Sequence, residues 1–252
     1  MRPPVDHIEA PAFPPRLPWI NVAALRMDQQ RGRPVLIEFW DFCRPNSMRT
    51  LPYVGSWHER YEPDGLRVIG VHSSGFPPSV EPEAVEDAVA RLHITHPVVV
   101  DTDLQIWQEY GNLGWPARYL FNQEGRLVDF HYGEGGYDET EAAIQELLGV
   151  KRPPLAPLRP EDAPGAVLVA QSEDVEGLWS GPYEAGGVWA VLEGQGTVTA
   201  NGQTTPVDHP GAYELISHPV STAGVLALEV SSGVTCHAVC FTPGLAGPDR
   251  AD

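Results

Sequence analysis

The chain has 252 residues, of which 34 are acidic and 16 basic, so its formal net charge is -18. A hydrophobic fraction of 42% is enough for a folded core and disfavours wholesale disorder. The acidic balance disfavours nucleic acids and anionic membranes as partners, because binding to either needs clustered Lys and Arg side chains.

The N-terminal residues, MRPPVDHIEAPAFPPRLPW, are rich in proline and lack the apolar core of a secretory signal. No run of 18 apolar residues occurs, so no transmembrane helix is predicted. We therefore expect a cytoplasmic protein, or an extracytoplasmic one if an N-terminal signal has been removed.

A proline-rich stretch at residues 151–165, KRPPLAPLRPEDAPG, divides the chain. Proline cannot continue a helix or join the centre of a sheet, so this stretch is interpreted as a stiff linker. It predicts a first domain at residues 1–150 and a second at residues 166–252.

The first domain alternates strand-like and helix-like segments. The run PVLIEFW (34–40) is typical of a buried parallel strand, and residues 47–61 place apolar side chains at helical spacing. Further strands are expected at residues 66–71, 97–100, 118–121 and 127–131, and further helices at 81–92, 101–110 and 138–148. Asp101 or Thr102 would cap the third helix, NQEG indicates a hairpin, and Gly149 would end the last helix. This order predicts an α/β domain.

The second domain has no helical periodicity and predicts a small all-β sandwich or jelly roll. Asn201-Gly202 is a hairpin signal of the type I′ turn. Strands are expected at residues 166–170, 188–193, 196–200, 212–216, 225–230 and 234–241. Cys236 and Cys240 would share one face of the last strand, too far apart for a mutual disulfide, and are interpreted as structural thiols.

The segment VLIEFWDFCRPNSMRTLPY resembles the active-site region of thioredoxin-like proteins of the TlpA/AhpC-TSA group. Within that group it is similar to the soluble region of DipZ-type cytochrome c biogenesis proteins. AFPPRLPW, GLRVIGVHSSGF, GWPARYL and HYGEGGYDETEAAIQELL resemble further parts of the same domain. The resemblance implies a thioredoxin-like fold with a cis bond between Trp115 and Pro116.

The second domain resembles the carbohydrate-binding-module-like jelly roll that follows the thioredoxin domain in DipZ-type proteins. The segments GVWAVLEGQGTVTANG, YELI and GVTCHAVCFTPG support this resemblance. A cupin barrel is the rival interpretation, but GGVWAVLEG lacks the paired histidines of a cupin metal site. We expect no bound metal or cofactor, and interpret His209, His218 and His237 as turn or surface residues.

The redox motif that the resemblance implies is degenerate. A CxxC motif needs one thiolate at a helix N-terminus and a second thiol three residues later. A gapless alignment places Arg44 and Ser47 at these two positions. A gap would place Cys43 at the first position instead, but it would break the five-residue spacing from Ser47 to Pro52. Cys43 precedes them, and if it is accessible, the helix N-terminus and Arg44 would make it the most reactive thiol of the chain. Its alternative interpretation is a half-buried structural thiol.

In thioredoxins the cis-proline loop offers backbone groups to extended peptides. The resemblance therefore implies a groove for a peptide or protein partner at Trp40, Trp115 and Pro116. Arg49 is interpreted as a solvated residue on a helix face. His72 and His131 are interpreted as core or rim residues.

Three functional hypotheses follow from the sequence. The first is a thioredoxin-like protein without dithiol activity that binds a partner at the cis-proline groove. The second is a one-Cys thiol oxidoreductase or antioxidant protein that uses Cys43. The third is a glycan-binding adaptor, with Trp179, Tyr183, Trp189 and Tyr213 as a stacking platform, although such aromatics more often fill a core. The oligomeric state is not predicted.

Overall fold

The computed structural model describes residues 7–248. The chain divides into two compact units, one built mainly from residues up to Ala156 and the other from Pro157 onward. The architecture confirms an α/β domain followed by an all-β domain.

The first unit contains one six-stranded sheet with the strand order β1-β4-β3-β2-β5-β6. Strands β2, β3 and β4 run parallel, and β1, β5 and β6 each pair with a neighbour in the antiparallel sense. The strands are β1 (Trp19–Ile20), β2 (Val35–Trp40), β3 (Arg67–His72), β4 (Val98–Val100), β5 (Ala117–Phe121) and β6 (Leu127–Tyr132). The α-helices are α1 (Pro45–Tyr61), α2 (Pro82–Arg91), α3 (Gln105–Glu109) and α4 (Tyr137–Leu148).

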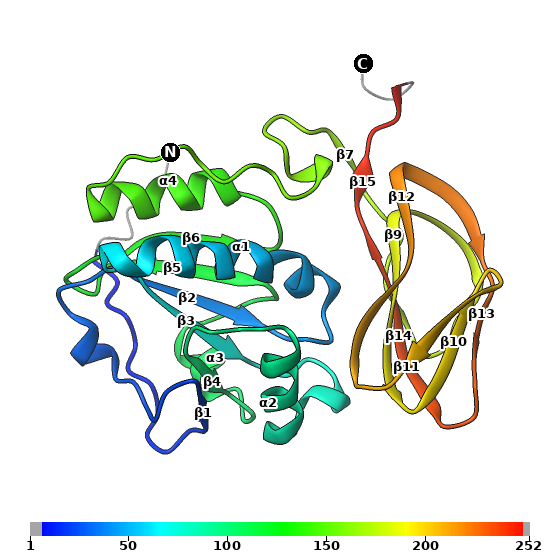
Figure 1. Ribbon diagram of the computed structural model, residues 1–252, viewed down its shortest axis with the longest axis horizontal. Helices are drawn as coiled ribbons and strands as arrows, with labels where there is room; N and C mark the ends of the chain where they lie inside the picture. Colours follow the sequence, from blue (N-terminus) through cyan, green and yellow to red (C-terminus); the bar gives the residue numbers. More distant parts are fainter. Residues whose placement is uncertain (1–6, 249–252) are drawn as a thin grey trace. The chain divides into compact units, whose positions relative to one another are not determined.

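Two apolar cores fill the opposite faces of this sheet. Helices α1 and α4 cover one face (Figure 1), where Val54, Trp57 and Ile144 pack against Leu36 and Leu120 of the strands. Helix α3 and the N-terminal segment cover the other face, around Ile37, Phe39 and Ile69. Every residue of β2 is buried, which agrees with its continuous apolar sequence.

The expected elements of the first unit occur with small shifts at their ends. Helix α1 begins at Pro45 rather than at residue 47, because proline fits the first position of a helix. Helix α3 begins only at Gln105, since Leu104 has a left-handed φ of 56°. The Asp101 carboxylate nevertheless accepts hydrogen bonds from the backbone N–H groups of Ile106 and Trp107, both at 2.9 Å.

The two local turn signals are confirmed. The NQEG turn joins β5 to the antiparallel β6, with Gly125 at a φ of 77°. Helix α4 ends at Gly149, whose φ of 66° is the left-handed conformation that terminates many helices.

The second unit is a β-sandwich. A four-stranded sheet has the order β12-β9-β14-β8, and a three-stranded sheet has the order β11-β10-β13. Its core draws Leu192 and Phe241 from the larger sheet and Val198 and Leu228 from the smaller one. The strands are β7 (Leu168–Val169), β8 (Val175–Glu176), β9 (Gly181–Gly194), β10 (Gly196–Ala200), β11 (Gln203–Val207), β12 (Gly211–Leu226), β13 (Leu228–Val230), β14 (Val234–Thr242) and β15 (Gly244–Leu245).

Across both units, short 3-10 helices lie at Met27–Gln30, Glu62–Asp64, Pro77–Ser79 and Pro160–Asp162.

The turn at Asn201-Gly202 is confirmed, with left-handed φ values of 48° and 84° at its two central residues. The expectation that Cys236 and Cys240 share a face is wrong. The β14–β9 register shifts between Cys236 and Ala238, and this bulge reverses the alternation of side chains. Cys236 therefore packs against the sandwich core, whereas the buried Cys240 lies on the other face of the strand.

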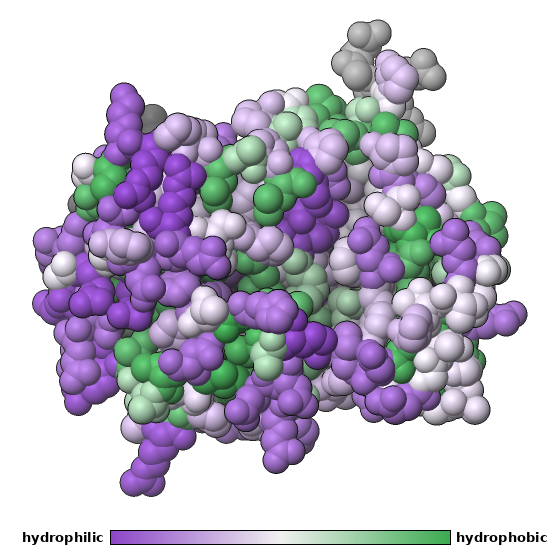
Figure 2. All heavy atoms as spheres, in the orientation of Figure 1, coloured by the Kyte–Doolittle hydropathy of each residue, from purple (hydrophilic) through white to green (hydrophobic). Residues whose placement is uncertain are grey.

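Hydrophilic residues cover most of the face drawn in Figure 2, and hydrophobic residues appear there as separate patches. Among residues 7–248, no helix combines the length and the apolar character that a bilayer crossing requires.

Close backbone packing in the second unit yields a stability prediction. A Cβ atom built on Gly186 would lie 2.5 Å from the Cα atom of Gly244 and would also overlap the carbonyl oxygen of Pro243. Because backbone atoms cannot move aside cheaply, Gly186→Ala should lower the free energy of unfolding by about 1–3 kcal/mol in urea denaturation. Gly247→Ala is the control, since nothing lies within 4 Å of its Cβ position. Equal stability of the two variants would contradict this packing.

Candidate functional site

The candidate site lies where β2 ends and α1 begins. The backbone N–H of Asp41 donates to the hydroxyl oxygen of Ser47 at 3.2 Å. Ser47 is fully buried, and Arg44 is half-buried directly before the first residue of α1. Cys43 is also fully buried, so this structure does not expose its thiol to solvent.

Asp41 joins this junction to the loop that follows β3. Its carboxylate accepts a hydrogen bond from the backbone N–H of Gly75 at 2.7 Å. The other carboxylate oxygen lies 3.7 Å from the Nε2 atom of His72. Both side chains are buried, so the placement of His72 in the core is confirmed.

The loop before β5 carries the expected cis peptide bond between Trp115 and Pro116. The indole N–H of Trp115 donates to the carbonyl oxygen of Ser73 at 2.7 Å. The Trp115 ring also packs on Trp107, with the ring centroids 4.2 Å apart. Asn112 fixes the loop from within, since its side-chain N–H donates to the carbonyl oxygen of Gly114 at 3.1 Å.

The expected groove residues differ in accessibility. Trp40 is fully buried and packs edge-to-face on His72, with the ring centroids 5.0 Å apart. The expectation that Trp40 lines a groove is therefore wrong, because the last position of a parallel central strand is covered on both faces. Pro116 is buried as well, whereas Trp115 remains partly exposed.

Two buried titratable side chains are neighbours in the sheet beside the site. Glu38 of β2 and Arg118 of β5 are cross-strand neighbours, and both are buried. Burial raises the pKa of Glu38 to about 8, against the opposing effect of the Arg118 charge. Burial lowers the pKa of Arg118. The Arg118 guanidinium lies 5.0 Å from the ring centre of Tyr137 and 5.6 Å from that of Trp57. Sequence reasoning missed this pair, although Glu38 is the one charge within the apolar run PVLIEFW.

The expectation that Arg49 is solvated is wrong. Its guanidinium lies 2.7 Å from the carboxylate of Glu134, and their side chains are only 8% and 15% exposed. The carbonyl oxygen of Glu134 lies 2.9 Å from the Nε2 atom of the half-buried His131. This ion pair joins α1 to the loop before α4, so its charges are held within the fold.

The aromatic residues of the second unit do not gather into one exposed platform. Tyr183 and Trp189 are buried, and Tyr183 stacks on Phe241 in the core with centroids 5.7 Å apart. Tyr213 stacks on His209 instead, with centroids 4.9 Å apart. The partly buried Trp179 packs against the same core.

The other two histidines of this unit also have protein partners. The Nε2 atom of His218 lies 2.9 Å from the hydroxyl of Tyr183, and that of His237 lies 2.9 Å from the Glu193 carboxylate. Within residues 7–248, no three His, Cys, Asp or Glu side chains gather closely enough to hold a metal ion.

The raised pKa of Glu38 predicts a pH-dependent stability. Between pH 4.5 and about 8, the folded chain keeps a proton on Glu38 that the unfolded chain has released. The folded state therefore loses stability as the pH rises through this range. Glu38→Gln removes this titration. As the pH rises, the free energy of unfolding of the variant should therefore fall less steeply than that of the wild type, and the two slopes should differ by about 1 kcal/mol per pH unit.

Urea denaturation at several pH values measures this slope. Glu124→Gln is the matched control, since Glu124 is an exposed carboxylate of the same unit. Parallel pH profiles for the wild type and Glu38→Gln would contradict the assignment.

Comparisons with known proteins identify chains that are similar to this one in sequence and fold. No protein-family model matches the chain. Protein DipZ of Mycobacterium tuberculosis is 34% identical over 163 residues, which cover 61% of this chain and 24% of DipZ. Thiol-disulfide oxidoreductase YkuV of Bacillus subtilis is 28% identical over 130 residues, which cover 52% of this chain and 87% of YkuV.

The fold also matches solved structures. The crystal structure of the thioredoxin-like superfamily protein SPOA0173 superposes with a TM-score of 0.52 at 24% identity, covering 57% of this chain and 99% of that one. The match to DipZ spans only 24% of the length of that relative, so it compares a part of DipZ with this chain. The first unit of the chain is a thioredoxin-like domain, with homologues that include DipZ and thiol-disulfide oxidoreductases.

Proposed function

We propose that this chain is a thioredoxin-family protein without dithiol chemistry, which binds a peptide or protein partner beside its cis-proline loop. The observation that carries the proposal is the pair Arg44 and Ser47 at the start of α1, where the gapless alignment expects the two redox cysteines. Neither side chain can form or exchange a disulfide.

The chemistry of the family explains why this loss matters. Dithiol exchange needs a first thiolate that attacks a substrate disulfide and a second thiol that resolves the mixed disulfide. Ser47 has a hydroxyl in the place of the resolving thiol, and it accepts a hydrogen bond from the Asp41 N–H. Arg44 puts a permanent positive charge in the place of the attacking thiolate.

The scaffold around the altered motif supports partner binding. The hydrogen bond of Trp115 to Ser73 and its contact with Trp107 tie the loop that ends in Pro116 to the loop after β3 and to α3. Leu113, at the start of this loop, is 81% exposed and supplies apolar surface. A bound extended segment would lie along the backbone of Gly114 and Trp115, with no covalent step.

The one-Cys alternative has one favourable and one unfavourable feature. Cys43 lies close to the N-terminus of α1 and next to Arg44, and both favour a thiolate. Its complete burial does not favour attack on a dissolved peroxide or disulfide. The glycan-binding alternative loses support because Tyr183 and Trp189 are buried.

Catalytic reduction of insulin disulfides tests the proposal. The wild type should not accelerate insulin reduction by dithiothreitol, whereas Arg44→Cys with Ser47→Cys should recover partial activity. The single variant Arg44→Cys is the matched control and should stay inactive, because it has no resolving thiol at residue 47. Catalytic turnover by the wild type would refute the proposal.

Thiol labelling separates the one-Cys alternative. Burial raises the pKa of Cys236 to about 11 and also raises the pKa of Cys240, so both thiols should react slowly with iodoacetamide. If Cys43 is a structural thiol, mass spectrometry of briefly labelled native protein should show that Cys43 is labelled no faster than Cys236 and Cys240. Preferential labelling of Cys43 would instead support the one-Cys enzyme.

A further inference from the structure

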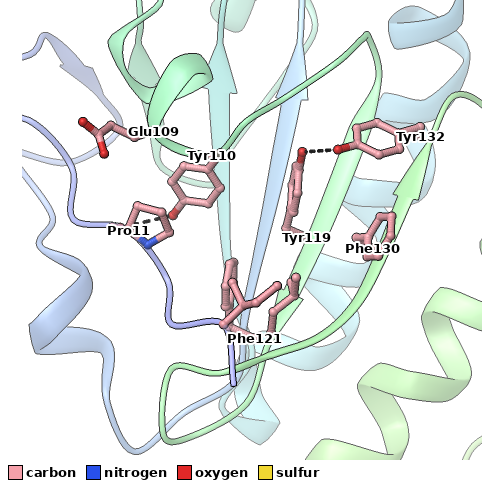
Figure 3. Close-up of a pocket in the computed structure, with 9 residues that line it drawn as sticks. Pro11, Glu109, Tyr110, Tyr119, Phe121, Phe130 and Tyr132 are labelled. Carbon is pink, nitrogen blue, oxygen red and sulfur yellow. Dashed lines mark hydrogen bonds between the residues drawn. The ribbon is translucent and has the colours of Figure 1, made fainter. Parts of the chain in front are cut away.

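A cavity of about 230 Å³ opens in the first unit between the end of α3, strands β5 and β6, and the N-terminal segment. Its walls are mostly aromatic (Figure 3): Tyr110 and Pro11 stand on one side, Phe130 and Tyr132 on the other, and Tyr119 lies between them. The N-terminal segment is held in place because the backbone N–H of Leu127 donates to the carbonyl oxygen of Ile8 at 2.8 Å.

The hydrogen bonds inside this aromatic pocket fix which polar groups a ligand meets. Asn112 donates from its side-chain nitrogen to Gly114, which turns its amide oxygen toward Tyr119. The Tyr119 hydroxyl donates to that oxygen at 2.9 Å. Tyr119 thereby uses its only proton, so the Tyr132 hydroxyl, 2.9 Å away, is the donor to Tyr119. Tyr132 keeps an acceptor lone pair and has no proton left for a ligand.

Tyr110 repeats this pattern on the opposite wall. Its hydroxyl donates to the carbonyl oxygen of Pro11 at 3.4 Å, so its remaining capacity is also that of an acceptor. The lining residues include one charged side chain, the exposed Glu109 next to Tyr110, and no Lys, Arg or His. The pocket therefore offers aromatic walls, hydrogen-bond acceptors and a carboxylate at its margin.

These features favour a cation and disfavour an anion. Aromatic rings attract ammonium groups through their negative faces, and cages of such rings recognise methylated ammonium groups. The net charge of -18 adds a general attraction for cations. Phe130 and Tyr132 are each 38% exposed, so a ligand can reach their rings from solvent. The volume is below the roughly 300–1,000 Å³ of pockets for drug-sized ligands and fits a smaller molecule.

We propose that the aromatic pocket formed by Tyr110, Tyr119, Phe121, Phe130 and Tyr132 binds a small organic cation that carries a methylated ammonium group. The site is separate from the junction of β2 and α1, and its occupancy does not depend on the chemistry proposed there.

Paired titrations test this assignment on the full chain. Choline is the cationic probe, and 3,3-dimethylbutanol is its neutral probe of the same shape. Amide NMR spectra should show choline shifting residues of β5 and β6, with an affinity roughly two- to thirty-fold above that of the neutral probe. Equal or weaker binding of choline would overturn the proposal, as would the absence of shifts with both probes.

Two substitutions at one position identify the source of the preference. Tyr132→Phe keeps the ring and should retain the preference for choline, whereas Tyr132→Leu keeps apolar volume without the ring and should lower the preference several-fold. Circular dichroism checks that both variants fold, and Phe130→Leu replaces Tyr132→Leu if the latter does not. A full preference for choline in the folded Leu variant would also overturn the proposal.

Discussion

The buried carboxylate of Asp41 is the constraint on which the geometry of the candidate site depends. Asp41 follows the last residue of β2, and its own N–H donates to Ser47 in the first turn of α1. Its carboxylate reaches the loop after β3 through Gly75 and faces His72. A buried carboxylate is costly without such partners. The same contacts that stabilise Asp41 therefore fix the junction between β2 and α1.

The contacts around this junction bear on the proposal that the thioredoxin-like fold is kept here without a dithiol. The cis-proline loop is held through Trp115 and Ser73, and none of these contacts involves a cysteine. The ion pair of Arg49 and Glu134 joins α1 to the loop before α4. Glu38 and Arg118 are buried neighbours on β2 and β5. These contacts hold the first unit together without a disulfide, which is compatible with the proposal that Arg44 and Ser47 occupy the motif.

Sequence reasoning succeeded where a structure depends on local signals. The apolar run of β2, the turn at Gly125 and the helix end at Gly149 each depend on a few neighbouring residues. It failed where residues distant in sequence meet. Arg49 and Glu134 are 85 positions apart, so the helical pattern around Arg49 did not reveal its partner and led to the wrong expectation of a solvated side chain. The bulge near Cys236 is also set by the pairing of β14 with β9, which the sequence of β14 does not encode by itself.

The aromatic pocket shows the same limit. Tyr119 and Phe121 alternate along β5, and Phe130 and Tyr132 alternate along β6, which is the signal for one aromatic sheet face. That signal could have been read from the sequence, but the contribution of Tyr110 and Pro11 depends on tertiary packing. For the candidate site, the sequence motif was recognisable, but the burial of Cys43 and Trp40 could not be predicted from it.

The central claim is that this thioredoxin-like domain has no redox-active thiol pair. Equilibration of the native full chain in buffers from fully reducing to fully oxidising dithiothreitol, followed by acid quenching and intact mass spectrometry, measures this directly. The account predicts that all three cysteines remain thiols across the series, since none is disulfide-bonded in the structure and Cys236 and Cys240 lie on different faces of β14. Loss of two hydrogens from the protein mass, with a defined midpoint potential, would contradict it.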